Sequence, residues 1–250
     1  MRGPEYFFLD FDGVVCDSIP ECFLSSHTAY KTLLRGETVT EVSLREKKLF
    51  YAYRPFIRSG EDYILIHDMI RRGVEVESQE IFDREIEKAG AGTMKEYGRL
   101  FYRAREALLA SEREFWLDLN PLFAGMAEIL RAVASHPNFY ILSTKKPPFI
   151  LEILSHNAVT WEEGRVLFPG DRTKKEVIES ELPPEKRAIF VDDQLDHLLA
   201  AAKNPNIVCA LAKWGYVKKP WLEQKEIPVI GEKDLLQFAE GFFRETFPGG

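Results

Sequence analysis

The segment DFDGVVCDS, residues 10–18, contains the side chains of this chain that are best suited to chemistry. Asp10 and Asp12 directly follow a short apolar run, and Gly13 lets the chain turn sharply behind them. Two carboxylates this close repel each other unless a cation or a proton lies between them. Mg²⁺ suits this place, because it prefers hard oxygen ligands and often takes only one or two carboxylates. Alone, the pair is more typical of a solvated turn; the apolar run and the segments described next favour a cation site.

A second candidate lies in YILSTKK, residues 140–146. Ser143 follows an apolar run, with Thr144 beside it, and we expect the hydroxyl and backbone N–H of Ser143 to be available to an oxyanion. Lys145 or Lys146 could add positive charge. Alone, the segment favours another interpretation, in which a Ser/Thr residue caps the following helix and both lysines lie on the surface.

A third candidate is GDRTKKEVI, residues 170–178. Thr173 and Glu176 have the spacing of a capping box, which predicts that a helix begins here. Lys174 then falls in the first turn, where the helix dipole disfavours positive charge. This local cost is understandable if the lysine faces a bound anion; the alternative is a solvated lysine beside Lys175.

A fourth candidate is AIFVDDQLDH, residues 188–197. Asp192 and Asp193 follow an apolar run, and adjacent carboxylates at the end of a strand repel each other and are poor strand formers. A bound divalent cation would remove this conflict. A helix N-cap role would account for one of the two residues and leave the other unexplained.

The elements that must position these residues form an alternating pattern. Four apolar runs are too short for helices and lack polar alternation, as expected for strands buried on both faces of a parallel sheet. Helical patterns lie between the later runs, which predicts a doubly wound α/β fold with a parallel sheet. The expected strands are 6–9, 139–142, 188–191 and 207–211, and the expected helices are 122–135, 149–155, 174–181, 195–202 and a last covering helix over 234–247.

The segment 19–119 has no convincing buried strand, and its apolar residues recur at helical spacing. Gly90 and Gly92 indicate a helix end and a turn within it. We therefore expect an all-helical domain of roughly 100 residues, within the usual size range, inserted after the first strand. The α/β core then comprises residues 1–18 and 120–250.

Composition narrows the classes of function. The chain is 45% hydrophobic and 29% charged with a formal net charge of −7, which argues against a nucleic-acid partner. An anionic substrate is compatible with this charge if the site itself is locally positive. No apolar run is long enough to span a bilayer, so no membrane partner is expected. The N-terminus does not resemble a signal peptide, and three cysteines without a C-x-x-C pair fit a reducing compartment, so we expect a cytoplasmic protein.

The four segments, in this order, resemble the four signature motifs of the haloacid dehalogenase superfamily. DFDGVVCDS resembles the first motif, Ser143 the second, Lys174 the third and the Asp192–Asp193 pair the fourth. The helical insertion resembles the cap that follows the first motif in relatives of phosphoglycolate phosphatase and β-phosphoglucomutase. The resemblance implies a Rossmann-like core with an inserted helical cap.

It also implies a role for each carboxylate. Asp10 would attack phosphorus and form an aspartyl phosphate, while Asp12 would protonate the leaving group and then activate water. An oxygen of Asp10, the backbone carbonyl of Asp12 and Asp193 would hold Mg²⁺, with Asp192 nearby. Asp12 also argues against the dehalogenase branch of the superfamily, which differs at this position and needs no metal.

The phosphoryl oxygens would be bound by Ser143 with Thr144 and by Lys174. The choice between Lys174 and Lys175 stays open, although the spacing of Lys174 to the apolar residues that follow matches the family pattern. The implied function is a Mg²⁺-dependent phosphatase that hydrolyses a small phosphorylated metabolite. The alternatives are a phosphomutase acting on a sugar phosphate and a catalytically idle binding protein of the same fold, the latter disfavoured because every motif residue is present. The sequence identifies neither the metabolite nor the oligomeric state.

Substrate choice is expected to lie in the helical insertion, because the core motifs recognise only phosphate and metal. The first place to look is RPFIRSGED, residues 54–62, where a proline and a glycine predict a loop between two helices. Arg54 and Arg58 offer guanidinium groups suited to a carboxylate or phosphate. The alternative, slightly favoured, is that both arginines are solvated or paired with Glu61 and Asp62.

Overall fold

The chain divides into two compact units, each described here by itself. The computed structural model describes residues 4–39, 42–235 and 237. One unit comprises residues 1–17 and 122–250, and the other comprises residues 18–121. The sequence places the corresponding boundaries after residues 18 and 119.

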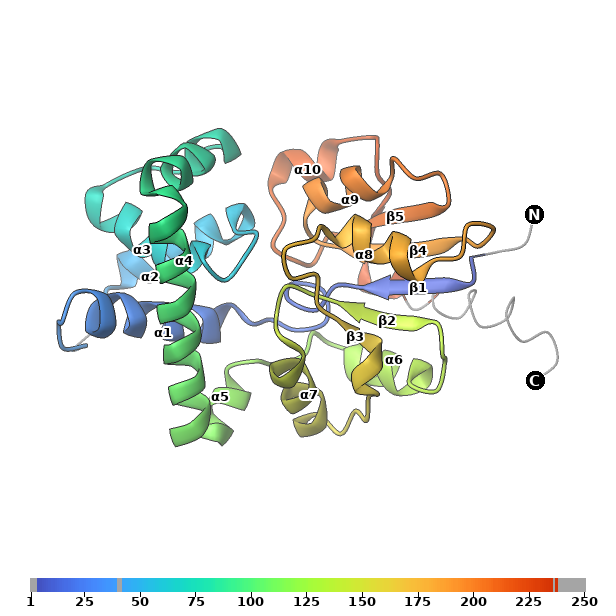
Figure 1. Ribbon diagram of the computed structural model, residues 1–250, viewed down its shortest axis with the longest axis horizontal. Helices are drawn as coiled ribbons and strands as arrows, with labels where there is room; N and C mark the ends of the chain where they lie inside the picture. The colour runs from blue at the N-terminus through green and yellow to red at the C-terminus, as the bar shows by residue number, and fades with distance from the viewer. Residues whose placement is uncertain (1–3, 40–41, 236, 238–250) are drawn as a thin grey trace. The chain divides into compact units, whose positions relative to one another are not determined.

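The first unit, called the sheet unit, is built on a six-stranded sheet in which all strands are parallel (Figure 1). Its strand order, β3-β2-β1-β4-β5-β6, confirms the predicted doubly wound α/β class. The four expected strands are present, whereas β3 and β6 were not expected, since two residues are too few to form a recognisable pattern. The strands are β1 Tyr6–Leu9, β2 Phe139–Leu142, β3 Val166–Leu167, β4 Ala188–Asp192, β5 Ile207–Ala212 and β6 Val229–Ile230.

The order of the strands reverses between β1 and β4. These two neighbours pair in register from Tyr6 opposite Ala188 to Leu9 opposite Val191, so their carboxyl ends lie side by side. In open α/β sheets, ligands bind beyond the carboxyl ends of the strands at this reversal. The residues that directly follow β1 and β4 are therefore the ones to examine for function.

The helices of the sheet unit follow the expected order. The first begins later than expected because Gly125 has a φ of +79° and turns the chain just before Met126. The short helix α10 was not expected, and the helix expected over 234–247 lies almost entirely outside the described residues. The helices are α6 Met126–Val133, α7 Pro147–His156, the short 3₁₀ turn η3 Glu163–Arg165, α8 Lys174–Glu181, α9 Leu195–Ala201 and α10 Lys219–Glu223.

Apolar side chains cover both faces of the sheet. On one face, Ile178 of α8 and Leu198 of α9 belong to the same buried cluster as Phe190 of β4. On the other face, the rings of Phe7 and Phe139 stack with their centroids 4.5 Å apart. Burying a side chain of this size contributes about 1.5–3 kcal/mol, so these contacts hold the strand ends in a fixed relation.

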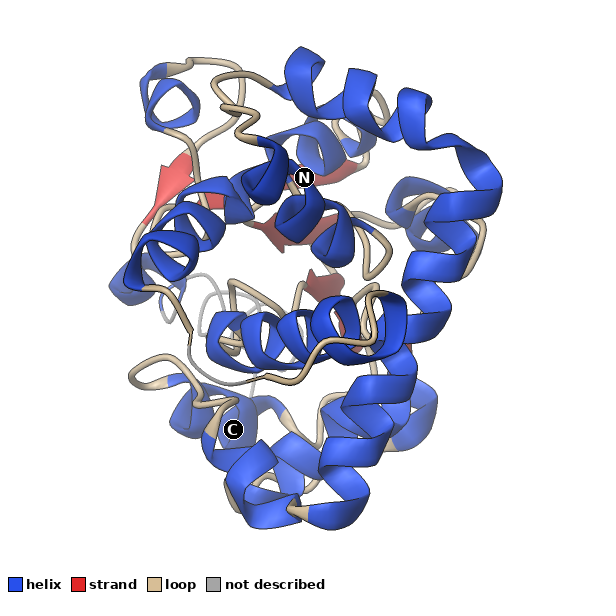
Figure 2. Ribbon diagram, turned by 90° about the vertical axis from the view of Figure 1, so that its left-hand side faces the viewer, coloured by secondary structure: helices blue, strands red, loops and turns tan. Residues whose placement is uncertain are grey.

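The second unit, residues 18–121, is called the helical unit, and its described residues form helices and no strand (Figure 2). Its longest helix, α4, is broken at Gly90, which has φ +78° and ψ 154°. Gly90 thus separates two helical segments, as the pair of glycines indicated. The helices are α1 Ile19–Thr28, the π-helix η1 Ala29–Leu34, α2 Leu44–Tyr53, the 3₁₀ turn η2 Arg54–Phe56, α3 Asp62–Arg72, α4 Gln79–Ser111 and α5 Arg113–Asp118.

Buried polar contacts tie these helices together. Arg105 of α4 donates to both carboxylate oxygens of Glu21 in α1, at 3.0 and 2.7 Å, and both side chains are almost fully buried. His67 of α3 lies 2.9 Å from the hydroxyl of Ser26 and 3.0 Å from a carboxylate oxygen of Glu46. Because removing one partner of such a pair leaves the other buried without compensation, these contacts fix the packing of the helical unit.

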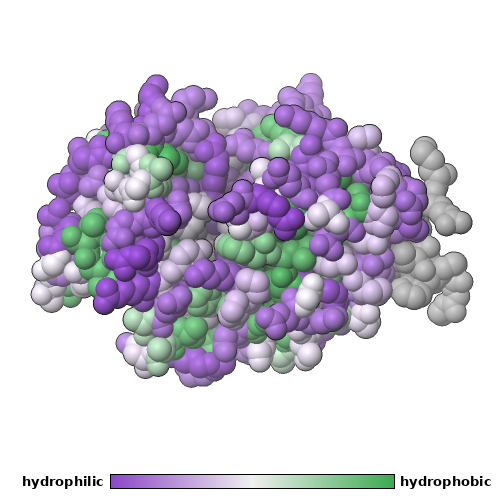
Figure 3. All heavy atoms as spheres, viewed as in Figure 1, coloured by the Kyte–Doolittle hydropathy of each residue, from purple (hydrophilic) through white to green (hydrophobic). Residues whose placement is uncertain are grey.

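Hydrophilic residues predominate on the face drawn in Figure 3, as expected for a chain with 29% charged residues. Within the described residues, no helix is both long and apolar enough to cross a membrane.

Candidate active site

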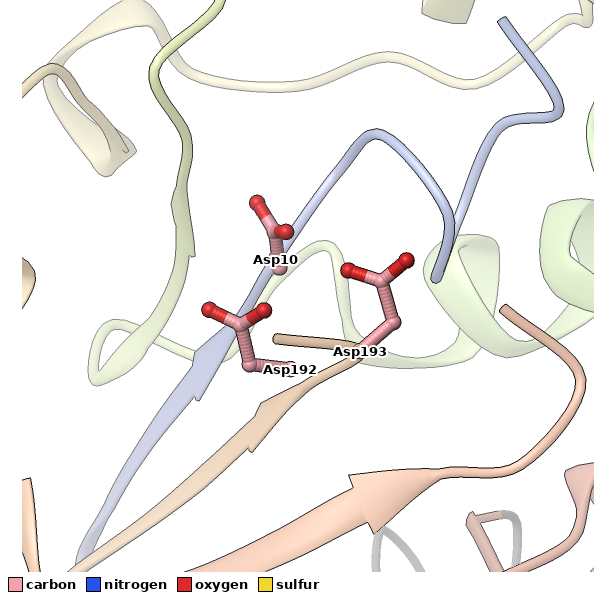
Figure 4. Close-up of side chains that lie close together, drawn as sticks. All are labelled: Asp10, Asp192 and Asp193. Carbon is pink, nitrogen blue, oxygen red and sulfur yellow. The ribbon is translucent and has the colours of Figure 1, made fainter. Parts of the chain in front are cut away.

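Three buried carboxylates meet at the reversal of the strand order (Figure 4). Asp10 directly follows β1, Asp192 ends β4, and Asp193 is the next residue. Each offers an oxygen within 4.8 Å of the others, and none is more than 5% exposed. Adjacent parallel strands of matched register bring these carboxylates together. The resemblance to the four motifs implied the same grouping, with Asp192 near Asp10 and Asp193.

Lys174 supplies positive charge to this cluster. Its Nζ atom lies 2.7 Å from Oδ1 of Asp10 and 2.8 Å from Oδ2 of Asp192, and the side chain is buried. The expected capping box between Thr173 and Glu176 is present and fixes the start of α8, so that Lys174 falls in its first turn. The next residue, Lys175, is paired instead with Glu179, four residues along the helix, at 3.5 Å. Of the two lysines, Lys174 is therefore the one that contacts the carboxylate cluster.

The charges in the cluster shift one another's pKa values. Burial raises the pKa of Asp10 to about 7, although Lys174 opposes the shift, and Asp192 adds to it by repulsion. Burial also acts against the charged forms of Asp192 and Lys174. The neighbouring charges together outweigh this effect: Lys174 and His197 hold the pKa of Asp192 below its usual range, and Asp10 and Asp192 raise the pKa of Lys174. The site thus stabilises a charged Lys174–Asp192 pair beside a carboxyl group that readily takes up a proton.

Asp192 is held by protein donors on both of its oxygens. The backbone N–H of Gln194 donates to Oδ1 at 2.8 Å, and Nδ1 of His197 lies 3.0 Å from Oδ2, the oxygen that also contacts Lys174. The N-cap of α9 is Gln194, without a side-chain cap, so the N-cap alternative for either aspartate is wrong. The sequence did not predict a role for His197, because a single histidine in the first turn of a helix forms no recognisable pattern.

Asp193 is enclosed between two glycines. Its Oδ2 accepts a hydrogen bond from the backbone N–H of Tyr216 at 2.7 Å. A β-carbon at Gly13, which has a φ of +91°, would lie 2.1 Å from the same oxygen, and one at Gly215 would lie 2.4 Å from the carbonyl oxygen of Gly13. Glycine is therefore required at both positions, at Gly13 for conformation as well as for space.

Asp12 lies in the loop that follows β1, where it pairs with a buried lysine. Nζ of Lys145 lies 2.8 Å from Oδ1 of Asp12, and Lys145 is 2% exposed. The expectation of two surface lysines in the second segment is thus wrong for Lys145. Asp12 and Lys145 are 133 residues apart in the chain, so the local sequence around either residue does not indicate this contact.

Ser143 follows β2 but does not offer the backbone N–H that the sequence analysis expected. This N–H donates to the carbonyl oxygen of Leu167 at 3.1 Å, because the unexpected strand β3 pairs with β2. The buried hydroxyl of Ser143 accepts a hydrogen bond from the backbone N–H of Lys145 at 3.2 Å. Ser143 does not cap the next helix, whose N-cap is Lys146, and Thr144 is half-buried.

Arg54 and Arg58 lie in the helical unit, in η2 and in the loop before α3. The guanidinium of Arg58 forms two hydrogen bonds with the carboxylate of Asp83, at 2.7 and 3.3 Å. Arg54 is buried, with its guanidinium 5.6 Å from the centre of the Tyr63 ring. The carboxylate of Asp62 accepts a hydrogen bond from the backbone N–H of Arg58 at 2.8 Å. Arg58 is thus a half-exposed side chain with an acidic partner.

Comparison with known proteins identifies the fold. No family model matches the chain, and no curated protein matches it. A hydrolase of the haloacid dehalogenase-like family from Streptococcus pneumoniae is 17% identical, with a TM-score of 0.56 over 95% of this chain and 98% of that one. A predicted phosphoglycolate phosphatase from Haemophilus somnus is 15% identical, with a TM-score of 0.59 over 94% and 97% of the two chains. The fold is that of the haloacid dehalogenase-like proteins.

The haloacid dehalogenase-like fold does not by itself decide the reaction. Protein tyrosine kinase A from Mycobacterium tuberculosis shares it, at 18% identity and a TM-score of 0.54 over 96% of this chain and 100% of that one. The resemblance found in the sequence is therefore confirmed for the fold, and the function must be argued from the site.

Proposed function

We propose that this chain is a Mg²⁺-dependent phosphatase that hydrolyses a small phosphorylated metabolite through an aspartyl phosphate on Asp10. The observation that carries the proposal is the buried carboxylate of Asp10, 2.7 Å from the ammonium group of Lys174 and grouped with two further buried carboxylates. One site thus offers a nucleophile, a cation for phosphoryl oxygens and oxygen donors for a metal.

The donor set fits a hard divalent cation. Its atoms are carboxylate and carbonyl oxygens, the ligands that Mg²⁺ prefers. The four carboxylates outnumber the two ammonium groups and leave a formal charge of −2, which a divalent cation would balance. The charged groups counted here are Asp10, Asp12, Asp192, Asp193, Lys145 and Lys174.

The residues proposed to hold Mg²⁺ are Asp10, Asp193 and the backbone carbonyl of Asp12. Asp192 is assigned to a supporting role, because both of its oxygens already accept hydrogen bonds, one of them from Lys174. When bound, the cation would neutralise charge on the phosphoryl oxygens.

The reaction proposed for the side chains has two steps. In the first, a carboxylate oxygen of Asp10 forms a bond to phosphorus while the bond from phosphorus to the leaving oxygen breaks. Asp12, which takes up a proton from solvent before this step, gives that proton to the leaving oxygen and becomes a carboxylate. In the second, the oxygen of a water molecule attacks phosphorus while Asp12 takes a proton from that water. The bond from phosphorus to the Asp10 oxygen breaks, which releases inorganic phosphate and restores the Asp10 carboxylate and the protonated Asp12. The contact with Lys145 at 2.8 Å fixes the direction of the Asp12 carboxylate and favours its ionised form, which suits the second step, in which Asp12 acts as the base.

Lys174 and the residues after β2 are proposed to bind the phosphoryl oxygens. Lys174 is buried and charged, so it can offer its donors without rearrangement. Ser143 contributes its hydroxyl group rather than its backbone N–H, which pairs with β3, and Thr144 is adjacent.

A panel of phosphorylated metabolites, assayed with Mg²⁺, tests the proposal. We expect release of inorganic phosphate from one chemical class of substrate, and none from the Asp10→Asn variant. Conversion of a sugar phosphate to its isomer without free phosphate would indicate a phosphomutase instead. No reaction with any member of a broad panel, with Mg²⁺ bound, would count against an enzyme of either kind.

A further inference from the structure

The loop that follows β5, residues 213–217, reaches across the end of β4 to the loop that follows β1. Strand β5 pairs with β4 and not with β1, yet Nε1 of Trp214 donates to the carbonyl oxygen of Val14 at 2.9 Å. Tyr216 donates its backbone N–H to Asp193 and its hydroxyl group to Oδ1 of Asp17, each at 2.7 Å. A single residue thus contacts a carboxylate of the candidate metal site and the far end of the β1 loop.

The same loop encloses Asp193 from one side. A β-carbon at Gly215 would lie 2.4 Å from the β-carbon of Asp193 and 2.4 Å from the carbonyl oxygen of Gly13. Asp193 itself is 1% exposed. The direction of its carboxylate therefore depends on where the loop after β5 lies, and not only on its own side-chain torsions.

The hydroxyl group of Tyr216 contacts the chain where it leaves the sheet unit. Asp17 is the last residue of the sheet unit, and Ser18 is the first of the helical unit. A hydroxyl that donates to a carboxylate at 2.7 Å forms a charge-assisted hydrogen bond, which is stronger than a bond between neutral groups. Tyr216 is therefore bound at one end to Asp193 and at the other to the segment by which the chain leaves the sheet unit.

We propose that Tyr216 is a positioning residue of the metal site. Its hydroxyl bond to Asp17 holds the loop after β5 in the place from which its backbone N–H orients Asp193 toward the cation. This inference rests on the proposed function, and it adds a residue that is outside all four motifs. It follows that removing one hydroxyl group weakens cation binding although every proposed ligand is intact.

The test is the Tyr216→Phe variant of the full chain, which loses the hydroxyl group and retains the backbone N–H. We expect the dissociation constant for Mg²⁺, measured by calorimetry on metal-stripped protein, to rise by about three- to tenfold. This is less than the loss typical of a residue that contacts a ligand directly, because the N–H contact persists. Tyr30→Phe is the matched control, since it removes a hydroxyl group bonded to Arg71 in the helical unit and should leave the constant unchanged.

Asp17→Ala removes the same hydrogen bond from the other side and decides the matter if Tyr216→Phe does not fold. The double variant should bind Mg²⁺ no more weakly than whichever single variant binds it more weakly. The reason is that both substitutions remove the same hydrogen bond. Unchanged binding in Tyr216→Phe, or an equal loss in Tyr30→Phe, would overturn this inference and leave the proposed function intact. A wild-type protein that binds no Mg²⁺ would overturn both.

Discussion

Asp10 must meet two opposed requirements. A nucleophilic carboxylate must be ionised, whereas burial raises the pKa of Asp10 to about 7. Lys174, 2.7 Å away, favours the ionised form, and a cation bound to the same carboxylate would favour it further. Ionisation of Asp10, the proposed nucleophile, is therefore coupled to occupation of the proposed metal site.

This coupling predicts that Mg²⁺ binds more weakly as the pH falls below 7. The empty site holds a proton on Asp10 below its raised pKa, and the cation must displace that proton. Affinity should thus fall by up to about tenfold per pH unit between pH 7 and pH 5.5, with proton release detected by calorimetry in buffers of different ionisation enthalpy. If the affinity for Mg²⁺ stays the same from pH 7 to pH 5.5, Asp10 does not bind the cation as a carboxylate.

Asp12 makes a separate prediction, which concerns the leaving group. Asp12→Ala should slow turnover by about two to four orders of magnitude, the usual worth of general acid–base catalysis. The loss should be smaller for nitrophenyl phosphate, whose leaving group departs with little need of a proton. Equal losses for good and poor leaving groups, compared by steady-state kinetics, would reduce Asp12 to a structural role.

The segment from η2 to the start of α3 is proposed to recognise the leaving group of the substrate. The ion pair between Arg58 and Asp83 is more than a third exposed on both sides, so it contributes only about 0.2–1 kcal/mol to stability. If Arg58 also binds the leaving group, Arg58→Ala should lower kcat/KM for the natural substrate by about 1–3 kcal/mol, mainly through KM. Small generic phosphates should be little affected.

Asp83→Ala is the control for this prediction, because it breaks the ion pair and leaves the guanidinium in place. It should lower stability as much as Arg58→Ala does, without the loss of kcat/KM. Arg54→Ala deserves the same kinetic measurement, although Arg54 is buried, so a fall in stability is also expected. Unchanged kcat/KM in both arginine variants would move the search for specificity to other parts of the helical unit.

The elements that could be predicted from the sequence are those with a strong local pattern. The apolar runs of β1, β2, β4 and β5 and the capping box of α8 were sufficient to predict their bounds closely. The meeting of Asp10, Lys174 and the aspartate pair was implied by the resemblance to the four motifs. Strand β3 was missed because two residues form no pattern, and this omission made the prediction for the Ser143 N–H wrong.

The residues that were missed are those defined by a distant partner. Lys145 was left open between a charge at the site and a surface residue, because nothing in STKK reveals Asp12, 133 positions earlier. Tyr216 lies outside the four segments, and His197 was not singled out at the end of the fourth. Their contacts with Asp193 and with Asp192 exist only in the folded chain. Local patterns thus predicted the elements, the resemblance implied which carboxylates and which lysine meet, and the structure added the residues that contact them.

For the whole molecule, metal binding should appear as stability. A cation that binds only the folded state adds about 2.7 kcal/mol when its concentration is a hundred times its dissociation constant. Mg²⁺ should therefore raise the melting temperature, and EDTA should reverse the effect together with any phosphatase activity. Asp193→Asn should need more Mg²⁺ for the same shift, because one hard ligand is weakened. A melting temperature insensitive to Mg²⁺ in the wild type would contradict the metal assignment.

The most direct test of the proposed mechanism is whether a phosphoryl group is transferred to Asp10. The protein is mixed with Mg²⁺ and the best substrate from the panel, quenched with borohydride, which reduces an acyl phosphate to an alcohol, and digested for mass spectrometry. The proposed mechanism predicts homoserine at position 10, dependent on Mg²⁺ and on substrate, and absent from Asp10→Asn. Turnover of that substrate with no reduction at residue 10, or with reduction at another carboxylate, would contradict it.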